Sequence, residues 1–289
     1  MNRNNPKGSA LDSDREQYDS QIAHTIWDLE QSVRKGRVTA ETRRVLIEAH
    51  ASQLEIIEER ASIGEKDRSF LLLQDRVSPG ILLLAGEASG TEDLKPVARF
   101  FHRAGFNVLA TTLAWRDQER PAYTPTFWQT CLDESSNRFD MLHVYSDRMT
   151  VGGCGLSASI MLHLAEDKKI DSLIALFPNL HSDVSFRERF KMMLKRWLPR
   201  GHKEPAAWNM QRRMVTDLAR TKAKNLDVPT LLVVEDLHDK TELGRSAATA
   251  ERLFSRRADE VKLVPSAQAS PRLLPQLKLE KLVCFARRT

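Results

Sequence analysis

The sequence has few cysteines, no long apolar run and no apolar segment near its first residues. Its three cysteines, Cys131, Cys154 and Cys284, form neither a CxxC pair nor a cysteine–histidine spacing. We therefore expect no disulfide framework, no zinc site and no other cofactor, and a reducing cytoplasm is the simplest location. No run approaches the roughly 18 apolar residues of a membrane span. The stretch from Asn2 to Asp14 also lacks the apolar core of a signal peptide.

The chain has the composition of a soluble protein with an uneven distribution of charge. Its 289 residues, of which 41% are apolar, suffice for one large domain with an appendage. The net charge is +5, but the stretch from Arg187 to Lys224 holds twelve Lys or Arg against three Asp or Glu. The rest of the chain is therefore slightly acidic, and this segment is a candidate surface for an anionic partner.

An N-terminal helical hairpin is predicted for residues 13–66, after a polar tail over residues 1–12. Two amphipathic stretches flank Gly36 to Val38, and Thr39 suits the N-cap of the second helix. The stripe positions are Tyr18, Ile22, Ile26, Leu29 and Val33, then Ile47, Ala51, Leu54, Ile57 and Ala61. Two short amphipathic helices cannot bury their apolar faces by themselves. We therefore expect the hairpin to dock on its own domain, on a second copy or on a partner.

Residues 69–289 alternate short apolar runs with helical stretches, a pattern typical of a parallel sheet buried on both faces. The predicted strands are 81–86, 106–111, 148–153, 170–178, 229–236 and 260–265, with 69–74 as an additional edge strand. The predicted helices include 92–104, 156–166 and 244–256. Residues 184–226 interrupt this rhythm with basic helical stretches, as an inserted helical cap would. The fold class is therefore α/β, with a mostly parallel central sheet flanked by helices.

Three stretches in this order resemble the α/β-hydrolases, above all the small bacterial carboxylesterases and monoacylglycerol lipases of the serine-aminopeptidase-like branch. "PGILLLAGEASGTEDLKPVARFFHRAGFNVLATTL" is similar to the oxyanion-loop region, and Trp128 is similar to a tryptophan that often precedes the nucleophile strand. "VPTLLVVEDLHD" and "LVPSAQASPRLL" are similar to the segments that deliver the catalytic acid and the histidine. The resemblance implies the α/β-hydrolase fold and a Ser–Asp–His triad.

The nucleophile position is where the sequence departs from this pattern. In the family the nucleophile occupies a strained G-x-S-x-G turn between a strand and a helix. In "VGGCGLSAS" the strand and helix spacing places Gly155 at the nucleophile position, with Gly153 and Ser157 on either side. Glycine has no side chain, so nucleophilic catalysis there is excluded. Two other registers stay open, with Ser157 or, less favourably because of Leu156, Cys154 as the nucleophile.

The histidine that serves as general base in the family is absent from its usual place in every register. The base follows the last core strand, but the last histidine of the chain is His238, and Gln268 stands at the aligned position. Glutamine cannot accept a proton from serine and return it to a leaving group. Asp239 matches the acid, as a remnant of the triad or as an ordinary polar loop residue. His238 is an alternative base, or a surface histidine.

The oxyanion loop is also altered. The resemblance implies backbone N–H donors at Glu87 and Leu156, but Ala85 replaces the usual histidine, and a carboxylate at position 87 opposes a developing oxyanion. We therefore expect a catalytically defective protein with a binding or scaffolding role. The alternative is an active carboxylesterase or acylglycerol lipase that uses Ser157 with an unconventional base, and a third possibility is a ligand sensor.

The expected partners follow from charge and amphipathicity. An acidic protein is favoured for the basic cap, whose candidate residues are Arg187, Arg189, Lys191, Lys195, Arg196 and Arg200. The ordinary alternative is a helix that packs its apolar stripe on the sheet with its charges in solvent. No nucleic-acid motif is present, a peripheral membrane contact is compatible with the charge, and an acyl or ester ligand fits the resemblance. The N-terminal hairpin is the second candidate interface, for a partner or a second copy.

Overall fold

A computed structural model describes residues 25–33, 35, 38–86, 90–113, 127–176, 228–236, 258–265 and 276–289. The chain divides into two compact units, Met1–Gln53 and Leu54–Thr289. Each unit is considered by itself. Among the described residues, no helix has the length and apolarity needed to cross a membrane.

Helical structure in the N-terminal region covers residues 25–33 and α2 (Ala40–Arg60). The predicted cap is confirmed, because Thr39 Oγ1 accepts the backbone N–H of Thr42 at 3.1 Å. Within the N-terminal unit, His50 Nε2 and Glu30 Oε1 lie 3.0 Å apart. Burial lowers the pKa of His50, although Glu30 opposes this shift.

The predicted apolar stripe of the second helix is wrong in part. Ala51 is exposed and Ile47 and Ile57 are only half-buried, whereas the buried positions recur every four residues. Those positions are Leu46, His50, Leu54 and Glu58. Two of the four side chains are polar, so the buried face of α2 could not be found from apolar spacing alone.

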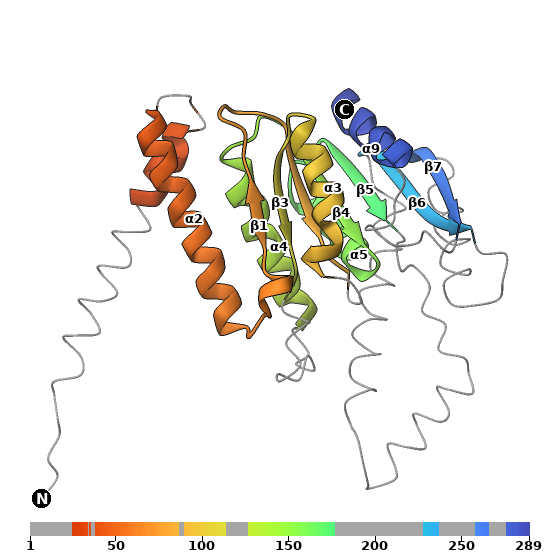
Figure 1. Cartoon of the computed structure of the whole chain (residues 1–289), viewed down its shortest axis with the longest axis horizontal. Coiled ribbons are helices and arrows are strands. Elements are labelled where there is room, and N and C mark those ends of the chain that lie inside the picture. Colours follow the sequence, from red (N-terminus) through yellow and green to blue (C-terminus); the bar gives the residue numbers. More distant parts are fainter. Residues whose placement is uncertain are drawn as a thin grey trace, which may run out of the picture. The chain divides into compact units, whose positions relative to one another are not determined.

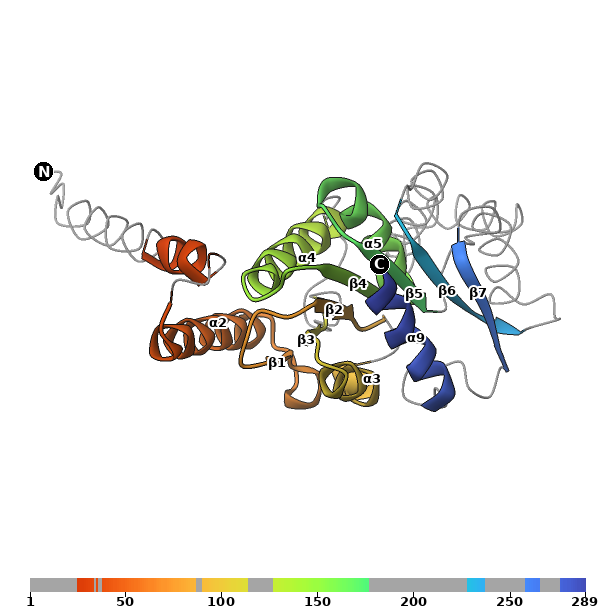
Figure 2. The same ribbon diagram turned by 90° about the horizontal axis from the view of Figure 1, so that it is seen from above.

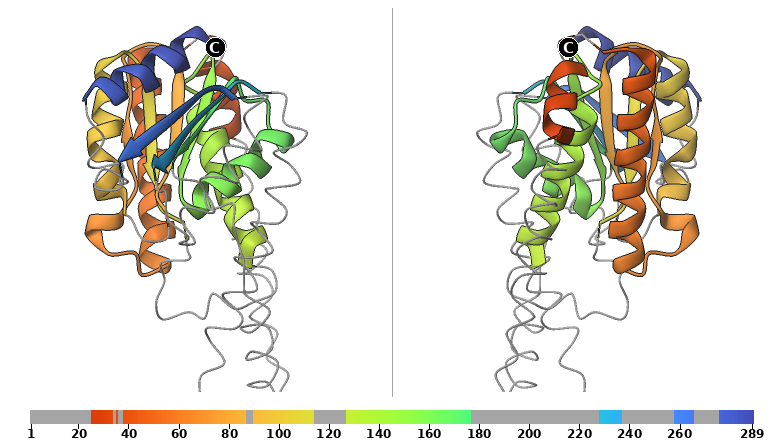
Figure 3. Two further views of the ribbon diagram at one scale, coloured as in Figure 1. Left: turned by 90° about the vertical axis from the view of Figure 1, so that its right-hand side faces the viewer. Right: turned by 90° about the vertical axis from the view of Figure 1, so that its left-hand side faces the viewer.

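The Leu54–Thr289 unit contains a seven-stranded sheet with the order β1-β3-β2-β4-β5-β6-β7 (Figure 1). Its strands are β1 (Phe70–Leu72), β2 (Gly80–Leu84), β3 (Asn107–Thr111), β4 (Met149–Cys154), β5 (Ser172–Leu176), β6 (Thr230–Asp236) and β7 (Ala258–Pro265). Only β1 is antiparallel to its neighbour. Every predicted strand is confirmed, including the edge strand, and β2 to β5 are fully buried. Figure 3 shows β6 and β7 rotated against the central strands, as sheet twist requires.

Helices cover both faces of the sheet (Figure 2). On one face lie α4 (Phe127–His143) and α5 (Leu156–Asp167), and on the other lie α3 (Thr91–Arg103) and α9 (Gln276–Arg288). Side chains alternate along β2, so Leu82 and Leu84 pack with α4 and α5, whereas Ile81 and Leu83 pack with α3 and α9. The predicted helices 92–104 and 156–166 are confirmed, whereas 244–256 and the cap at 184–226 lie outside the described residues.

The end of α2 belongs to the core of this unit, because Leu54 packs in the same apolar cluster as α4 and α5. A short 3₁₀ helix, η1 (Glu65–Asp67), then leads to β1. Because β2 to β7 are parallel, their carboxyl ends share one edge of the sheet. Binding sites of open α/β sheets lie at that edge.

The opposite, amino edge of the sheet is held by a buried asparagine. Asn107 is 0% exposed, and its Oδ1 accepts the Gln74 N–H at 2.7 Å. Its Nδ2 donates to Tyr145 O at 2.6 Å and to Ser78 O at 3.3 Å. One amide thus satisfies three backbone groups in two connecting segments, those from β1 to β2 and from α4 to β4.

We predict that Asn107→Ala lowers the free energy of unfolding by about 3 kcal/mol, because it removes the partner of the Gln74 N–H and of Ser78 O, and one of the donors to Tyr145 O, which also accepts the Ser78 N–H. Urea denaturation measures the change. The control is Asn137→Ala on the exposed face of α4, for which a change within about 0.5 kcal/mol is expected. Equal losses in the two variants would contradict this role of Asn107.

Candidate functional site

A sharp turn at the carboxyl edge joins β4 to α5. Its central residue, Gly155, has φ 61° and ψ −122°, a conformation that glycine adopts freely and other residues adopt only under strain. The Gly155 N–H donates to Leu176 O at the end of β5, at 3.0 Å. The strained position between strand and helix is therefore Gly155, two residues before Ser157.

The space around this turn differs at its two glycines. A Cβ atom on Gly153 would lie 2.5 Å from Ala158 N and 2.6 Å from Ser157 C, which are backbone atoms that cannot rotate away. Among the described residues, no atom lies within 4 Å of the position that a Cβ atom on Gly155 would occupy. The turn therefore excludes a side chain at Gly153 and leaves open space for one at Gly155.

Ser157 lies in the first turn of α5 and is 0% exposed. Its hydroxyl donates a hydrogen bond to Ala85 O, just beyond β2, and the Ala85 N–H donates to Thr111 O at 2.9 Å. Ser157 thus ties the start of α5 to the end of β2. Cys154, the last residue of β4, is 9% exposed, and Leu156 is 2% exposed at the start of α5.

Most other predicted site residues lie outside the described part of the chain. These are Glu87, His238, Asp239 and Gln268, together with the cap residues Arg187, Arg189, Lys191, Lys195, Arg196 and Arg200. Trp128 falls in α4, which precedes β4 in the chain. The turn and the end of β2 are the parts of the predicted site that the structure describes.

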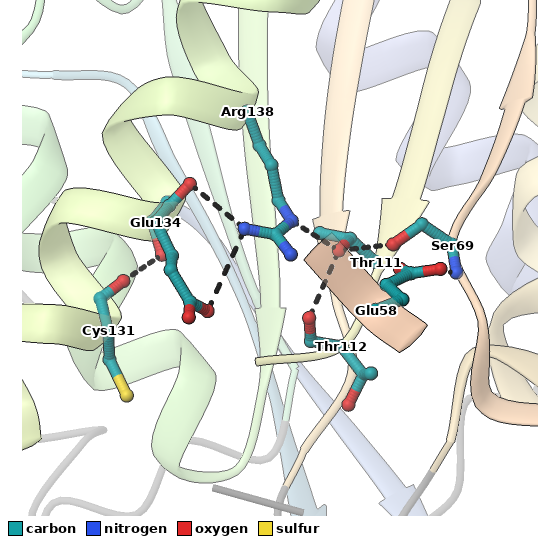
Figure 4. Close-up of polar contacts among 8 residues, drawn as sticks. Glu58, Ser69, Thr111, Thr112, Cys131, Glu134 and Arg138 are labelled. Carbon is teal, nitrogen blue, oxygen red and sulfur yellow. Dashed lines mark hydrogen bonds and ion pairs between the residues drawn. The ribbon is translucent and has the colours of Figure 1, made fainter. Parts of the chain in front are cut away.

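A second polar cluster at this edge was not predicted from the sequence (Figure 4). Arg138 of α4 is only 3% exposed, and its Nε–H donates to Thr111 Oγ1 at the end of β3, at 2.7 Å. The Ser69 hydroxyl donates to the same oxygen at 2.6 Å. The Ser69 N–H donates to the buried Glu58 carboxylate at 2.8 Å. Glu134 lies 3.7 Å from the Arg138 guanidinium.

This cluster is a bridge between buried charges. The Thr111 and Ser69 hydroxyls link Arg138 to Ser69, and the backbone N–H of Ser69 completes the path to the Glu58 carboxylate. Because a buried charge requires a partner, the network explains how α4 can carry an arginine inside the domain. The Thr111 hydroxyl donates to Thr112 O and the Ser69 hydroxyl donates to Thr111, so the cluster can fix the end of β3 but offers no activated nucleophile.

Cys131, in the same region, is not a reactive thiol. Burial raises its pKa well above the usual range, the charge of Glu134 raises it further, and Arg138 opposes the shift. Figure 4 shows its sulfur pointing away from the Arg138 guanidinium. A thiolate is therefore disfavoured at this position. Among the described residues, no group of three His, Cys, Asp or Glu could hold a metal ion.

No protein-family model matches the sequence, and no curated protein matches it significantly. Solved structures match it over about three quarters of its length. One represents LipS and LipT, two metagenome-derived lipolytic enzymes, at 13% identity and a TM-score of 0.56, over 78% of this chain and 99% of that chain. Another is DcsB in complex with a substrate analogue, at 15% identity and a TM-score of 0.56, over 76% and 94%.

The monoacylglycerol lipase of Paleococcus ferrophilus matches at 13% identity with a TM-score of 0.50, over 75% of this chain and 98% of that chain. The TM-scores show a shared fold, and identities of this size leave the activity undetermined. The order of strands, the turn after β4 and these structural matches agree. The protein therefore has the α/β-hydrolase fold.

Proposed function

We propose that this protein is a catalytically defective α/β-hydrolase-fold protein, a pseudoenzyme with a binding or scaffolding role. The observation that carries the proposal is the conformation of Gly155 in the turn between β4 and α5. In this fold that strained position carries the nucleophile and exposes its side chain. Gly155 has the open space that a side chain needs and has no side chain to fill it.

Ser157 does not fit the role of a substitute nucleophile. Its hydroxyl is buried and already donates to Ala85 O. It also lies within the helix, where no backbone strain presents it to a substrate. These features support a structural role, in which Ser157 fastens α5 to β2, and they oppose an active esterase built on Ser157.

The residue at the position of the general base supports the same conclusion. Gln268 stands where the family has its histidine, and no histidine follows His238 in the remaining fifty-one residues. Asp239 is then a remnant of the acid position, and Glu87 and Leu156 mark the former oxyanion donors. A site that has lost both its nucleophile and its base has no route to acyl transfer.

A binding role is compatible with this loss. Replacing the nucleophile by glycine keeps the turn, removes its strain and leaves space at the carboxyl edge, where ligands of open α/β sheets bind. An acyl or ester ligand bound without turnover fits the likeness to lipases. The cap residues Arg187 to Arg200 and the N-terminal hairpin are the proposed contacts for an acidic protein or a second copy, in a cytoplasmic setting.

We predict that the purified protein hydrolyses p-nitrophenyl butyrate no faster than buffer and does not react with a fluorophosphonate. The double variant Gly155→Ser with Gln268→His regains a serine and a general base. Because general-base catalysis speeds hydrolysis, we expect its turnover to be roughly a hundredfold above the buffer rate. Initial rates monitored by p-nitrophenolate absorbance provide the test.

Two variants of buried serines on α5 test the alternative nucleophile. Ser157→Ala removes the candidate hydroxyl, and Ser159→Ala is its matched control. If the parent protein is active and only Ser157→Ala abolishes hydrolysis and labelling, Ser157 is the nucleophile and the proposal is wrong. A parent protein that neither hydrolyses the ester nor reacts with the fluorophosphonate supports the proposal. An active double variant supports the register centred on Gly155.

The two glycines of the turn give a second test, of stability. We expect Gly155→Ala to cost about 1 to 3 kcal/mol, because only the backbone conformation is strained. Gly153→Ala should cost about 4 kcal/mol or more, because its Cβ meets backbone atoms of α5. Urea denaturation measures both values.

Gly64→Ala serves as the control, since Gly64 is exposed, has φ −61° and has no atom near its Cβ position. A change within about 0.5 kcal/mol is expected there. If Gly155→Ala were as costly as Gly153→Ala, position 155 would lack the space that the proposed nucleophile position requires.

A further inference from the structure

Arginines from three elements meet at the amino edge of the sheet, the edge opposite the strained turn. The Arg287 guanidinium, on α9, donates to Ala104 O at the end of α3, beside Arg103. Arg148, just before β4, donates from Nη1 to Arg287 O at 3.4 Å. Arg288 follows in the last turn of α9. Hydrogen bonds thus connect α3, the start of β4 and α9.

We call this surface the amino-edge patch and define it by Arg99, Arg103, Arg148, Lys281, Arg287 and Arg288. Five of these side chains are exposed, and Arg148 is half-buried. None of the six forms an ion pair with a carboxylate of the described residues. The acidic residues next to them in the chain, Asp147 and Glu280, leave a clear excess of positive charge.

The preference of cations for the carboxyl ends of helices explains only part of the amino-edge patch. Cations in the last turn of a helix interact favourably with its terminal carbonyls, and this accounts for Arg103, Arg287 and Arg288. Arg148 is not in a helix, Arg99 lies one turn before the end of α3, and Lys281 lies in the first half of α9. These further cations add positive charge without a carboxylate partner among the described residues, and Arg148 bonds only a backbone carbonyl, Arg287 O.

We propose that the amino-edge patch is a docking surface for an acidic protein segment, rich in Asp or Glu. Guanidinium groups bind carboxylates in a two-pronged geometry, and five of the six cations are arginines. The surface lies on the ends of two packed helices and one strand, so the arginines are held by rigid elements. This inference is independent of whether the site at the turn is catalytic.

Two observations favour a protein over a membrane or a nucleic acid. Surfaces that bind membranes combine basic residues with exposed large apolar residues, and those that bind single strands use exposed aromatic residues. The exposed large apolar residues of the described chain are Trp27, Val45, Ile56 and Val77, and of these Val77 alone lies at the amino edge, in the connection from β1 to β2. One partly exposed valine does not provide the apolar face that a membrane or a single strand requires. A bilayer at this edge would also face away from the carboxyl edge, where a ligand would enter.

The test uses fluorescein-labelled deca-glutamate and fluorescence anisotropy with the full chain. The patch variant combines Arg103→Gln with Arg288→Gln, because both side chains are exposed and neither has a hydrogen bond or ion pair with a described residue. The control combines Arg60→Gln with Lys66→Gln, which removes the same charge near the opposite edge, where Thr91 at the start of α3 donates to Lys66 O. Equal melting temperatures verify that both variants are folded.

We expect the patch variant to bind deca-glutamate about tenfold more weakly than the parent, and the control to lose less than about twofold. High salt should weaken the parent's binding. Equal losses in the two variants would overturn the proposal, because binding would then follow net charge alone. It would also be overturned if phosphatidylserine vesicles or an RNA oligonucleotide bound in a patch-dependent manner while deca-glutamate did not.

Discussion

The junction between β4 and α5 constrains the rest of the domain, because the backbone of Gly153 lies against Ser157 and Ala158 with no room for a Cβ atom. To achieve this approach the chain must reverse at Gly155, in a conformation open to glycine. The Gly155 N–H then bonds the end of β5, and the Ser157 hydroxyl bonds the end of β2. α5 is consequently buried without interruption from Leu156 to Ala165. The turn thus has an architectural function that does not depend on a nucleophile, which explains how it persists around a glycine.

Two groups of buried polar side chains lie at the two edges of the sheet. At the amino edge, the Asn107 amide satisfies three backbone groups in two connecting segments. At the carboxyl edge, Thr111 accepts hydrogen bonds from Arg138 and Ser69, and Ser69 in turn bonds Glu58 at the end of α2. Through Leu54 and Glu58, the last turns of α2 are part of the hydrolase core. The segment that the sequence presents as an appendage therefore ends as a structural element of the main domain.

The sheet could be predicted from the sequence because strands buried on both faces are uniformly apolar, and each run from Ile81 onward matched a strand. The buried face of α2 could not, because His50 and Glu58 are buried by virtue of partners distant in the chain, Glu30 and Ser69. The burial of Arg138 could not be predicted for the same reason, because its partner Thr111 is distant in the chain. At the turn, the sequence left three registers open, and it could not decide between the two more favourable ones because small residues flank both Gly155 and Ser157. What separates them is the positive φ at Gly155 and the burial of Ser157, which depend on how α5 packs.

The two edges of the sheet separate two kinds of interaction. The carboxyl edge holds the strained turn and the open space at Gly155, whereas the amino edge gathers arginines from α3, the start of β4 and α9. In a parallel sheet these edges are opposite by construction, so a partner held at one edge does not obstruct a ligand at the other. The proposed scaffolding role fits this separation, because one rigid sheet would connect the proposed protein-docking surface to the proposed ligand site, and the two could be occupied together without competing for the same residues.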